Sequence, residues 1–368
     1  MGAVICSAKT EENEWKEEEQ LSKMEAVKML QLESLQQQVE RPPIVDGGQY
    51  KRKIIFDTDM GADDAVAFLL CLQQPQLDIL AVTTVHGNSH VDQVCVNVAT
   101  CLRNMERDIP IYKGCSQGLL RPWAQGTWPG HGSDGLGDSK SLFRDNIASP
   151  QKEHAAMAIV NLVRANPNEV ELLVIGPCTN VALALKLDPE LPNLIKRIWV
   201  MGGTSEGKGN IVCASEFNFH CDPEAANIMF KAFEVDKSVE PKLTLYPWEQ
   251  CCNHSLSWDF FDGLVGRKDK PATLAGFVLG EVAGAIERTT RILGKDSFYS
   301  EEQNKKFQFI ACDSFAAAVM IDDSITKEIQ TLHITVETAG NLTAGTTVID
   351  WYERHSENRN CRLVLDLD

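Results

Sequence analysis

The stretch that decides the fold is KIIFDTDMGADDAVAFLL, residues 53–70. Its first part, Ile54 to Phe56, is a short apolar strand, and a helical pattern follows from Ala62 to Leu72. Between the two stand four carboxylates within eight residues, with Gly61 among them. A strand that turns directly into a helix is the unit from which parallel α/β sheets are built. The stretch therefore predicts an α/β fold with acidic side chains where its first strand ends.

The same order of strand and helix recurs on the C-terminal side of this stretch. Helices are expected at about 91–105 and directly after Thr179-Asn180. Strands are predicted at 77–85, 172–175, 198–201, 243–246 and 332–336. Repeated strand-then-helix order implies an open, mostly parallel sheet flanked by helices. Ligands of such sheets bind beyond the carboxyl ends of the strands, so the residues that follow the strands matter most.

The composition restricts the class of protein. The chain has 368 residues, of which 43% are hydrophobic, enough for a large core. Its 35 basic and 52 acidic residues leave a net charge of −17, which argues against nucleic acid as a partner. No apolar run reaches the roughly 18 residues of a membrane span, and the first residues do not resemble a secretory signal. We therefore expect a cytoplasmic protein whose twelve cysteines are reduced thiols.

Residues 1–50 differ from the rest of the chain. An acidic run at 11–19 is followed by apolar residues at roughly helical spacing, which end at Arg41-Pro42-Pro43. This pattern predicts an acidic, helix-prone extension without chemistry of its own, followed by one folded domain at 51–368. Met1-Gly2 begins a myristoylation pattern in which Cys6 stands where Ser or Thr is usual. An unmodified start is favoured; the alternative is lipidation of Gly2 and Cys6, which would add a peripheral membrane contact.

The acidic cluster of Asp57, Asp59, Asp63 and Asp64 predicts a metal site. Four neighbouring carboxylates could not all stay ionised in a crowded cleft without a cation. Helix capping would explain one or two of these acids, but not four. Ligands that are all oxygen favour Ca²⁺ or Mg²⁺. An EF-hand is excluded, because the twelfth position from Asp57 is Phe68 rather than Glu.

Polar residues also follow the other predicted strands. They are His86-Gly87-Asn88, the stretch 176–180, Gly202-Gly203 with Asn210 and 216–218 beyond, and Cys312-Asp313-Ser314 before an apolar helix. Each alone is more typical of a loop, but their placement beside the acidic cluster makes them candidates for one site. A GxGxxG match at 130–135 follows Trp128-Pro129 instead of an apolar strand, so we reject a dinucleotide site there.

Taken together, these motifs resemble the inosine-uridine-preferring nucleoside hydrolases. The family's DxDxGxDD signature matches residues 57–64, and the resemblance continues through HGN at 86–88, GPCTN at 176–180, VMGG at 200–203, EFNFHCDPEAA at 216–226 and CDS at 312–314. It covers about residues 53–368. The resemblance implies a Rossmann-like core, one tightly bound Ca²⁺ and a homodimer or homotetramer. It also implies hydrolysis of the N-glycosidic bond of ribonucleosides to free base and ribose, in purine and pyrimidine nucleoside salvage.

The resemblance also implies a role for individual residues. The Ca²⁺ ligands would be Asp59, Asp64, the backbone carbonyl of Ile175, and Asp313. Asp59 would in addition be the general base toward the attacking water. The substrate side would be Asp63 and Asn218 at the ribose hydroxyls, Asn210 and Glu216 at the 5′-hydroxyl, Asn88 supporting the ribose, Met201 lining the pocket, and His131 in a lid near the base.

Cys312 departs from the common family pattern. Many members have His-Asp where this chain has Cys312-Asp313, and that His donates the proton to the leaving group. A neutral thiol, with an ordinary pKa near 8.5, is a weaker donor. The chain thus resembles a cysteine-bearing subgroup, in which Cys312 occupies the catalytic position. His131, His254 or a water are alternative donors.

Two other interpretations stay open at the level of sequence. A non-catalytic nucleoside-binding or ribose-binding protein would keep the Ca²⁺ and ribose contacts and lack the acid. Asp57-Thr-Asp59 after an apolar strand also looks like the nucleophile motif of haloacid dehalogenase-like phosphatases. That motif prefers Thr or Val where Gly61 stands, so we disfavour it.

Overall fold

The structure is a computed structural model that describes residues 51–122, 131–139, 141–143, 145–264, 273–287, 309–310 and 312–368. The predicted N-terminal helix and the acylation pattern at Gly2 and Cys6 lie outside these residues, as does Gly130 of the glycine-rich match. Within the described ranges, no helix is long and apolar enough to cross a membrane. No disulfide links the cysteines of these ranges.

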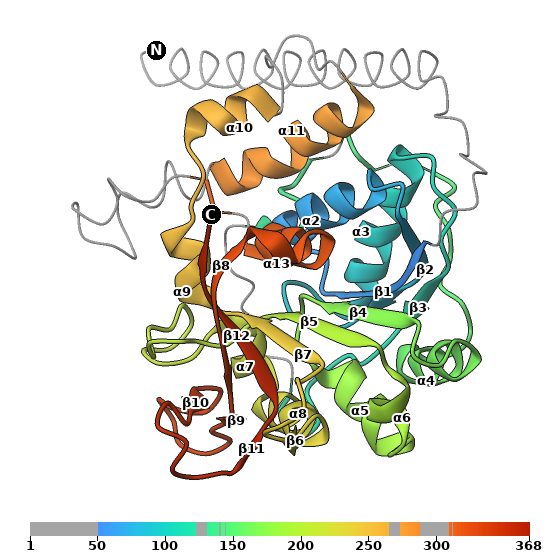
Figure 1. Ribbon diagram of the computed structural model, residues 1–368. Coiled ribbons are helices and arrows are strands. Elements are labelled where there is room, and N and C mark those ends of the chain that lie inside the picture. The colour runs from blue at the N-terminus through green and yellow to red at the C-terminus, as the bar shows by residue number, and fades with distance from the viewer. Residues whose placement is uncertain are drawn as a thin grey trace, which may run out of the picture.

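An eight-stranded sheet forms the centre of the molecule (Figure 1). Its strand order is β3-β2-β1-β4-β5-β7-β12-β8. The strands are β1 Arg52–Thr58, β2 Leu77–Thr84, β3 Ile111–Lys113, β4 Val170–Val174, β5 Arg197–Met201, β7 Leu243–Tyr246, β8 Thr326–Leu332 and β12 Cys361–Leu367. Neighbouring strands are parallel except β12 and β8, which are antiparallel at one edge. The predicted open, mostly parallel α/β sheet is confirmed.

Strand β1 is an inner strand and lies at the point where the strand order reverses. The chain proceeds from β1 to β2 and β3 on one side, and then returns to β4, β5 and β7 on the other. Residues 54–58 are buried because helices cover both faces of the sheet, which explains the continuous apolar run in the sequence. A crevice for ligands is expected beyond the carboxyl ends of β1 and β4.

Helices pack on both faces of the sheet (Figure 1). The described helices are α2 Ala62–Leu72, α3 Val91–Asn104, α4 Ala155–Ala165, α5 Thr179–Leu187, α6 Leu191–Leu194, α7 Phe217–Cys221, α8 Pro223–Ala232, α9 Trp248–Asn253, α10 Trp258–Leu264, α11 Leu274–Glu287 and α13 Cys312–Ile321. Of these, α11 packs mainly on α2 and not on the sheet itself. One apolar core joins Phe56 of β1 to α2, α3, α11 and α13. A second core joins Ile55 to α4, α5 and α8. The alternation of side chains along β1 therefore supplies both cores.

The predicted strand at 332–336 is wrong as one continuous element. Strand β8 ends at Leu332, and β9 Ile334–Val336 pairs with β10 Thr347–Ile349 in a separate antiparallel sheet. The side chain of Asn360 accepts a hydrogen bond from the Ile334 N–H and donates one to the Ile334 carbonyl. These two bonds satisfy the N–H and the carbonyl of Ile334 at the point where the chain leaves the main sheet. A third sheet pairs β6 Val235–Asp236 with β11 Asn358–Arg359.

Candidate active site

The acidic motif forms a tight turn between β1 and α2. The N–H of Met60, whose φ is 29°, donates to Thr58 Oγ1 at 2.9 Å. The N–H of Gly61 donates to Asp64 Oδ2 at 2.8 Å, so this carboxylate caps its own helix. Asp63 also lies in the first turn of α2, where the helix dipole favours negative charge. The turn thus places both carboxylates at the end of the sheet where the crevice is expected.

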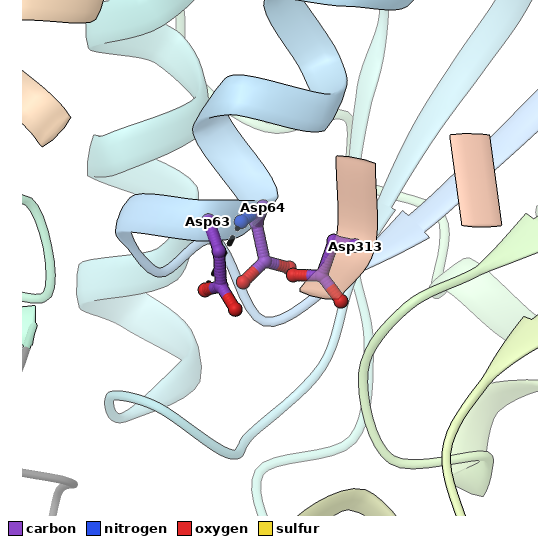
Figure 2. A group of neighbouring side chains, drawn as sticks. All are labelled: Asp63, Asp64 and Asp313. Atoms are coloured by element: carbon purple, nitrogen blue, oxygen red, sulfur yellow. Dashed lines mark hydrogen bonds between the residues drawn. The ribbon is translucent and has the colours of Figure 1, made fainter. Parts of the chain in front are cut away.

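Three carboxylates from two helices converge at this point. Asp63 and Asp64 of α2 and Asp313 of the first turn of α13 each offer an oxygen atom, and these atoms lie within 4.8 Å of one another (Figure 2). Burial, together with the charges of Asp63 and Asp64, raises the pKa of Asp313 well above its usual range. Burial raises the pKa of Asp63 to about 6. Such a cluster of oxygen donors fits a hard divalent cation, Ca²⁺ or Mg²⁺.

Asp59 is a further carboxylate next to Asp64. Its Oδ2 accepts a hydrogen bond from the Asn88 N–H at 2.7 Å, while its Oδ1 is buried without a partner within the described structure. Burial and the charge of Asp64 raise the pKa of Asp59. A buried, unpartnered carboxylate oxygen is costly unless a cation or a polar ligand reaches it. A methyl group on Gly87 would lie 2.0 Å from Asp59 Oδ2, so only glycine leaves room for Asp59.

Thr58 and Asn88 hold the carboxylate of Asp64. Thr58 Oγ1 donates to Asp64 Oδ1 at 2.5 Å, and Asn88 Nδ2 donates to Asp64 Oδ2 at 3.0 Å. Asn88 therefore binds Asp59 through its backbone and Asp64 through its side chain. The structure thus places Asn88 between two carboxylates of the acidic motif, and its support of the ribose stays a prediction.

His131 lies at the N-terminus of α2. Its Nδ1 accepts a hydrogen bond from the Ala62 N–H at 3.0 Å, and its Nε2 is 3.7 Å from Asp63 Oδ1. Because Nδ1 is the acceptor, Nε2 carries the hydrogen of the neutral ring. Burial lowers the pKa of His131 to about 4. The side chain of Asn97, which sequence analysis missed, donates to the carbonyls of Met60 and Asp134 and so joins the segment of His131 to the acidic turn.

The second half of the site follows β4 and β5. Asn218 Nδ2 donates to the carbonyl of Ile175 at 3.0 Å and to that of Met201 at 3.3 Å. These three predicted residues therefore lie together at the carboxyl ends of neighbouring strands.

Glu216 and Asn210 organise the start of α7. Glu216 accepts hydrogen bonds from the N–H groups of Gly203, Asn218 and Phe219. Asn210 Oδ1 accepts from the Phe217 N–H at 2.8 Å. Burial raises the pKa of Glu216 to about 7. The structure therefore brings both predicted 5′-hydroxyl ligands to the helix that carries Asn218.

Cys312 is buried next to Asp313 at the start of α13. A hydrogen bond with the Cys251 thiol, together with burial, raises the pKa of Cys312 well above its usual range, so the thiol stays protonated. The ring of His254 lies between the carbonyl of Gln250, 2.9 Å from Nδ1, and Asp366 Oδ1, 3.0 Å from Nε2.

Asp57, the first acid of the motif, stands apart from the metal group. Its Oδ1 accepts hydrogen bonds from Thr83 Oγ1 at 2.5 Å and Asn180 Nδ2 at 2.8 Å. Burial raises the pKa of Asp57 to about 7. These hydrogen bonds hold Asp57 between β1, β2 and α5 as a supporting group, whereas the phosphatase interpretation requires Asp57 to act as the nucleophile.

Comparisons with known proteins show the family of this chain. Residues 54–368 match the family described as inosine-uridine preferring nucleoside hydrolase. The non-specific ribonucleoside hydrolase RihC of Salmonella enteritidis is 31% identical over 315 residues, which cover 86% of this chain and 93% of that protein. The RihC of Salmonella newport is 32% identical over the same lengths.

Solved structures give the same result. An inosine-guanosine nucleoside hydrolase is 33% identical with a TM-score of 0.75, and the match covers 86% of this chain and 94% of that one. A purine-preferring ribonucleoside hydrolase from Gardnerella vaginalis, 23% identical with a TM-score of 0.72, shares the fold over 86% of this chain and 94% of its own.

Proposed function

This chain belongs to the inosine-uridine preferring nucleoside hydrolase family, and from this premise we propose that it is a Ca²⁺-dependent hydrolase of ribonucleosides. The family's reaction is cleavage of the N-glycosidic bond. The observation that carries the proposal is the convergence of Asp63, Asp64 and Asp313 beside the unpartnered oxygen of Asp59. The oxygen donors of this cluster suit Ca²⁺, and the cluster lies beyond the carboxyl end of β1, where α/β sheets bind ligands.

We assign the metal to Asp59, Asp64, Asp313 and the carbonyl of Ile175. That carbonyl accepts a hydrogen bond from Asn218, and its second lone pair leaves it able to bind a cation. A bound Ca²⁺ would supply positive charge that orients water and the ribose hydroxyls and makes the water easier to deprotonate. Asp63 belongs to the same cluster, so the ribose hydroxyls assigned to Asp63 and Asn218 would lie directly beside the ion.

Asp59 is the general base of this proposal. The Asn88 N–H fixes Asp59 Oδ2, and Oδ1 is left to accept a proton from water. Cleavage of the ribosyl bond builds positive charge on the sugar, which the surrounding carboxylates stabilise. A 2′-deoxyribose would leave buried polar groups unpaired, so selectivity for ribose is expected.

Cys312 is assigned to the leaving-group side of the site. Its protonated thiol can hydrogen-bond to a nucleobase, but a raised pKa makes it a weak acid. The alternative donor is the Nε2–H of His131, which is part of a neutral ring. Met201 lines the pocket, while Asn210 and Glu216 take the 5′-hydroxyl end.

The test is a base-release assay over inosine, adenosine, guanosine, uridine and cytidine, with and without a chelator. Relatives bear the names non-specific ribonucleoside hydrolase and inosine-guanosine nucleoside hydrolase, so release of the base from several nucleosides, including inosine and guanosine, is expected. A chelator should stop the reaction and added Ca²⁺ should restore it. Full activity in the chelator would overturn the metal assignment. Tight binding of ribose analogues without base release would instead support a non-catalytic binding protein.

A further inference from the structure

The loop between β5 and α7, residues 202–216, carries Asn210 and Glu216, the two residues assigned to the 5′-hydroxyl. Its middle is on the surface, because Glu206 and Lys208 are exposed. Gly207 has a φ of 71° and nothing within 4 Å of where a Cβ would stand. A surface loop of this kind holds two side chains in place only if another element fixes its backbone.

Glu249, in the first turn of α9, fixes this loop. Its Oε2 accepts hydrogen bonds from the Ser205 N–H at 2.7 Å and from Ser205 Oγ at 3.2 Å. Its Oε1 accepts from the N–H groups of Glu206 at 2.9 Å and Lys208 at 3.0 Å. Three backbone N–H groups of the loop therefore surround one carboxylate. The loop is on the surface, whereas Glu249 is only 4% exposed.

Along the chain, the residues that Glu249 contacts lie between β5 and the assigned substrate residues Asn210 and Glu216. Before them, Thr347 Oγ1 accepts from the Thr204 N–H, and the Gly203 carbonyl accepts from the Trp248 N–H. After them, the Asn210 N–H donates to the Ser215 carbonyl at 3.2 Å. Hydrogen bonds from several donors to one buried carboxylate are strong, and they break together if the charge is removed.

We propose that Glu249 is a positioning residue that holds the 202–216 loop so that Asn210 and Glu216 recognise the 5′-hydroxyl of the ribose. The inference rests on the proposed function, because it concerns the same substrate. Glu249 touches no substrate in this scheme and acts only through the loop. Its loss therefore affects recognition of the 5′-hydroxyl more than the bond-breaking step.

Glu249→Gln is the direct test, because Gln keeps the shape and replaces one acceptor oxygen with an NH₂ group that faces N–H donors. Glu171→Gln is the matched control. Glu171 is also buried and accepts hydrogen bonds from Arg52, Lys196 and Trp199, but it lies in β4 near the amino end of the sheet. Glu249→Asp, which keeps the charge and withdraws the carboxylate by one methylene, serves if the Gln variant does not fold.

Two measurements are needed for each variant. The first is kcat/KM for inosine and for 5′-deoxyinosine, and the second is amide hydrogen exchange of residues 204–210. We expect Glu249→Gln to lower kcat/KM for inosine about 10- to 100-fold, mainly through KM, and to change 5′-deoxyinosine far less. Exchange of residues 204–210 should accelerate. Glu171→Gln should leave both the substrate ratio and the exchange of the loop unchanged.

Unchanged exchange in both Glu249 variants would overturn the proposal, since the loop would then be held without Glu249. Faster exchange with an unaltered ratio of the two substrates would also overturn it. Asn210→Ala tests the 5′-hydroxyl site independently of Glu249. An active Asn210→Ala variant in which the ratio of kcat/KM for inosine and 5′-deoxyinosine is unaltered refutes that site. A wild-type protein that releases no base refutes the proposed function and the nucleoside role of Glu249 with it, while the exchange data still decide whether Glu249 holds the loop.

Discussion

The two carboxylate oxygens of Asp59 have different surroundings. One oxygen orients the side chain, and the other is available to react. Oδ2 is fixed by the Asn88 N–H, and Oδ1 has no hydrogen-bond partner within the described structure. A side chain arranged in this way is oriented before substrate arrives, which lowers the cost of reaching the reactive geometry.

Asp59→Ala should abolish hydrolysis and weaken Ca²⁺ binding, because one carboxylate is proposed as ligand and as base. The loss of a general base alone typically costs about 10²–10⁴-fold in rate. Base release and bound metal should be measured together. Asp57→Asn is the control, since Asp57 lies outside the metal group and its neutral isostere should retain activity within about tenfold. An Asp59→Ala variant with more than about a tenth of the wild-type kcat would contradict the assignment.

Cys312→His should speed hydrolysis where protonation of the leaving group limits the reaction. An imidazole with a pKa near 6.5 is partly protonated at working pH, and the Cys312 thiol has a pKa raised well above its usual range. The gain should be largest for inosine or uridine and small for a p-nitrophenyl riboside, whose leaving group needs little protonation. Equal effects on both substrates would mean that residue 312 does not act on the leaving group. A loss on both, with Ca²⁺ retained, would mean that the pocket is built for the smaller thiol.

At the residue scale, the sequence predicts site residues that directly follow strands better than residues that hold those site residues in place. Asp63 and Asp64 follow β1 directly, as the acidic motif predicts, whereas Asp313, which lies near them, was expected only from the family resemblance. Glu249 was missed, since a single Glu in a first helical turn is typical of ordinary helix capping. Its role depends on a loop about forty residues earlier, and no local pattern encodes that contact.

At the scale of elements, β1 and α2 form a unit that the sequence predicts closely. The helix runs from Ala62 to Leu72 as expected, because apolar residues and the acidic first turn mark its start. The edge strand β3 has only three residues, too few for a pattern. The break at His333 was missed because the residues on both sides are apolar or β-branched, and the side chain that fixes the break, Asn360, lies far along the chain.

Removal of residues 1–50 should leave a soluble, active enzyme, since the family match begins at residue 54 and the acidic motif at Asp57. Thermal unfolding and base release should match the full chain. Removal of residues 1–58 is the contrasting deletion, because it takes away β1 from between β2 and β4 and should prevent folding. An insoluble or inactive product of the shorter deletion would place the extension within the folded unit.

At the scale of the whole molecule, the acidic cluster links stability to metal and to pH. Burial, reinforced by neighbouring carboxylates, raises the pKa of Asp59, Asp64 and Asp313, and burial raises that of Asp63 to about 6. In the unfolded chain these groups ionise near pH 4. Without metal, the folded protein keeps protons that the unfolded chain has already released, so its free energy of unfolding falls as the pH rises from about 4 to about 7. A bound cation replaces those protons.

The difference in Tm between Ca²⁺-loaded and chelator-treated protein should therefore be larger at pH 7.5 than at pH 5.5. At pH 7.5, free Ca²⁺ about 1,000-fold above its Kd adds about 4 kcal/mol to the free energy of unfolding. That corresponds to roughly 10 °C in Tm. Scanning calorimetry at both pH values measures it, and Asp313→Asn should remove most of the Ca²⁺ effect. Identical Tm values with and without chelator at pH 7.5 would refute a metal at this cluster.

The insertion of β12 between β7 and β8 has a consequence for the synthesis of this protein. The ribosome synthesises β7 and β8 before β12. These two strands of the main sheet therefore lack their shared neighbour until residues 361–367 have been translated. Until then β7 has one unpaired edge and β8 has no neighbour in that sheet, and such edges recruit strands of other chains. A nascent chain paused between Leu332 and Cys361 already holds every residue assigned to the active site. It is nonetheless at a stage that is open to aggregation and to capture by chaperones.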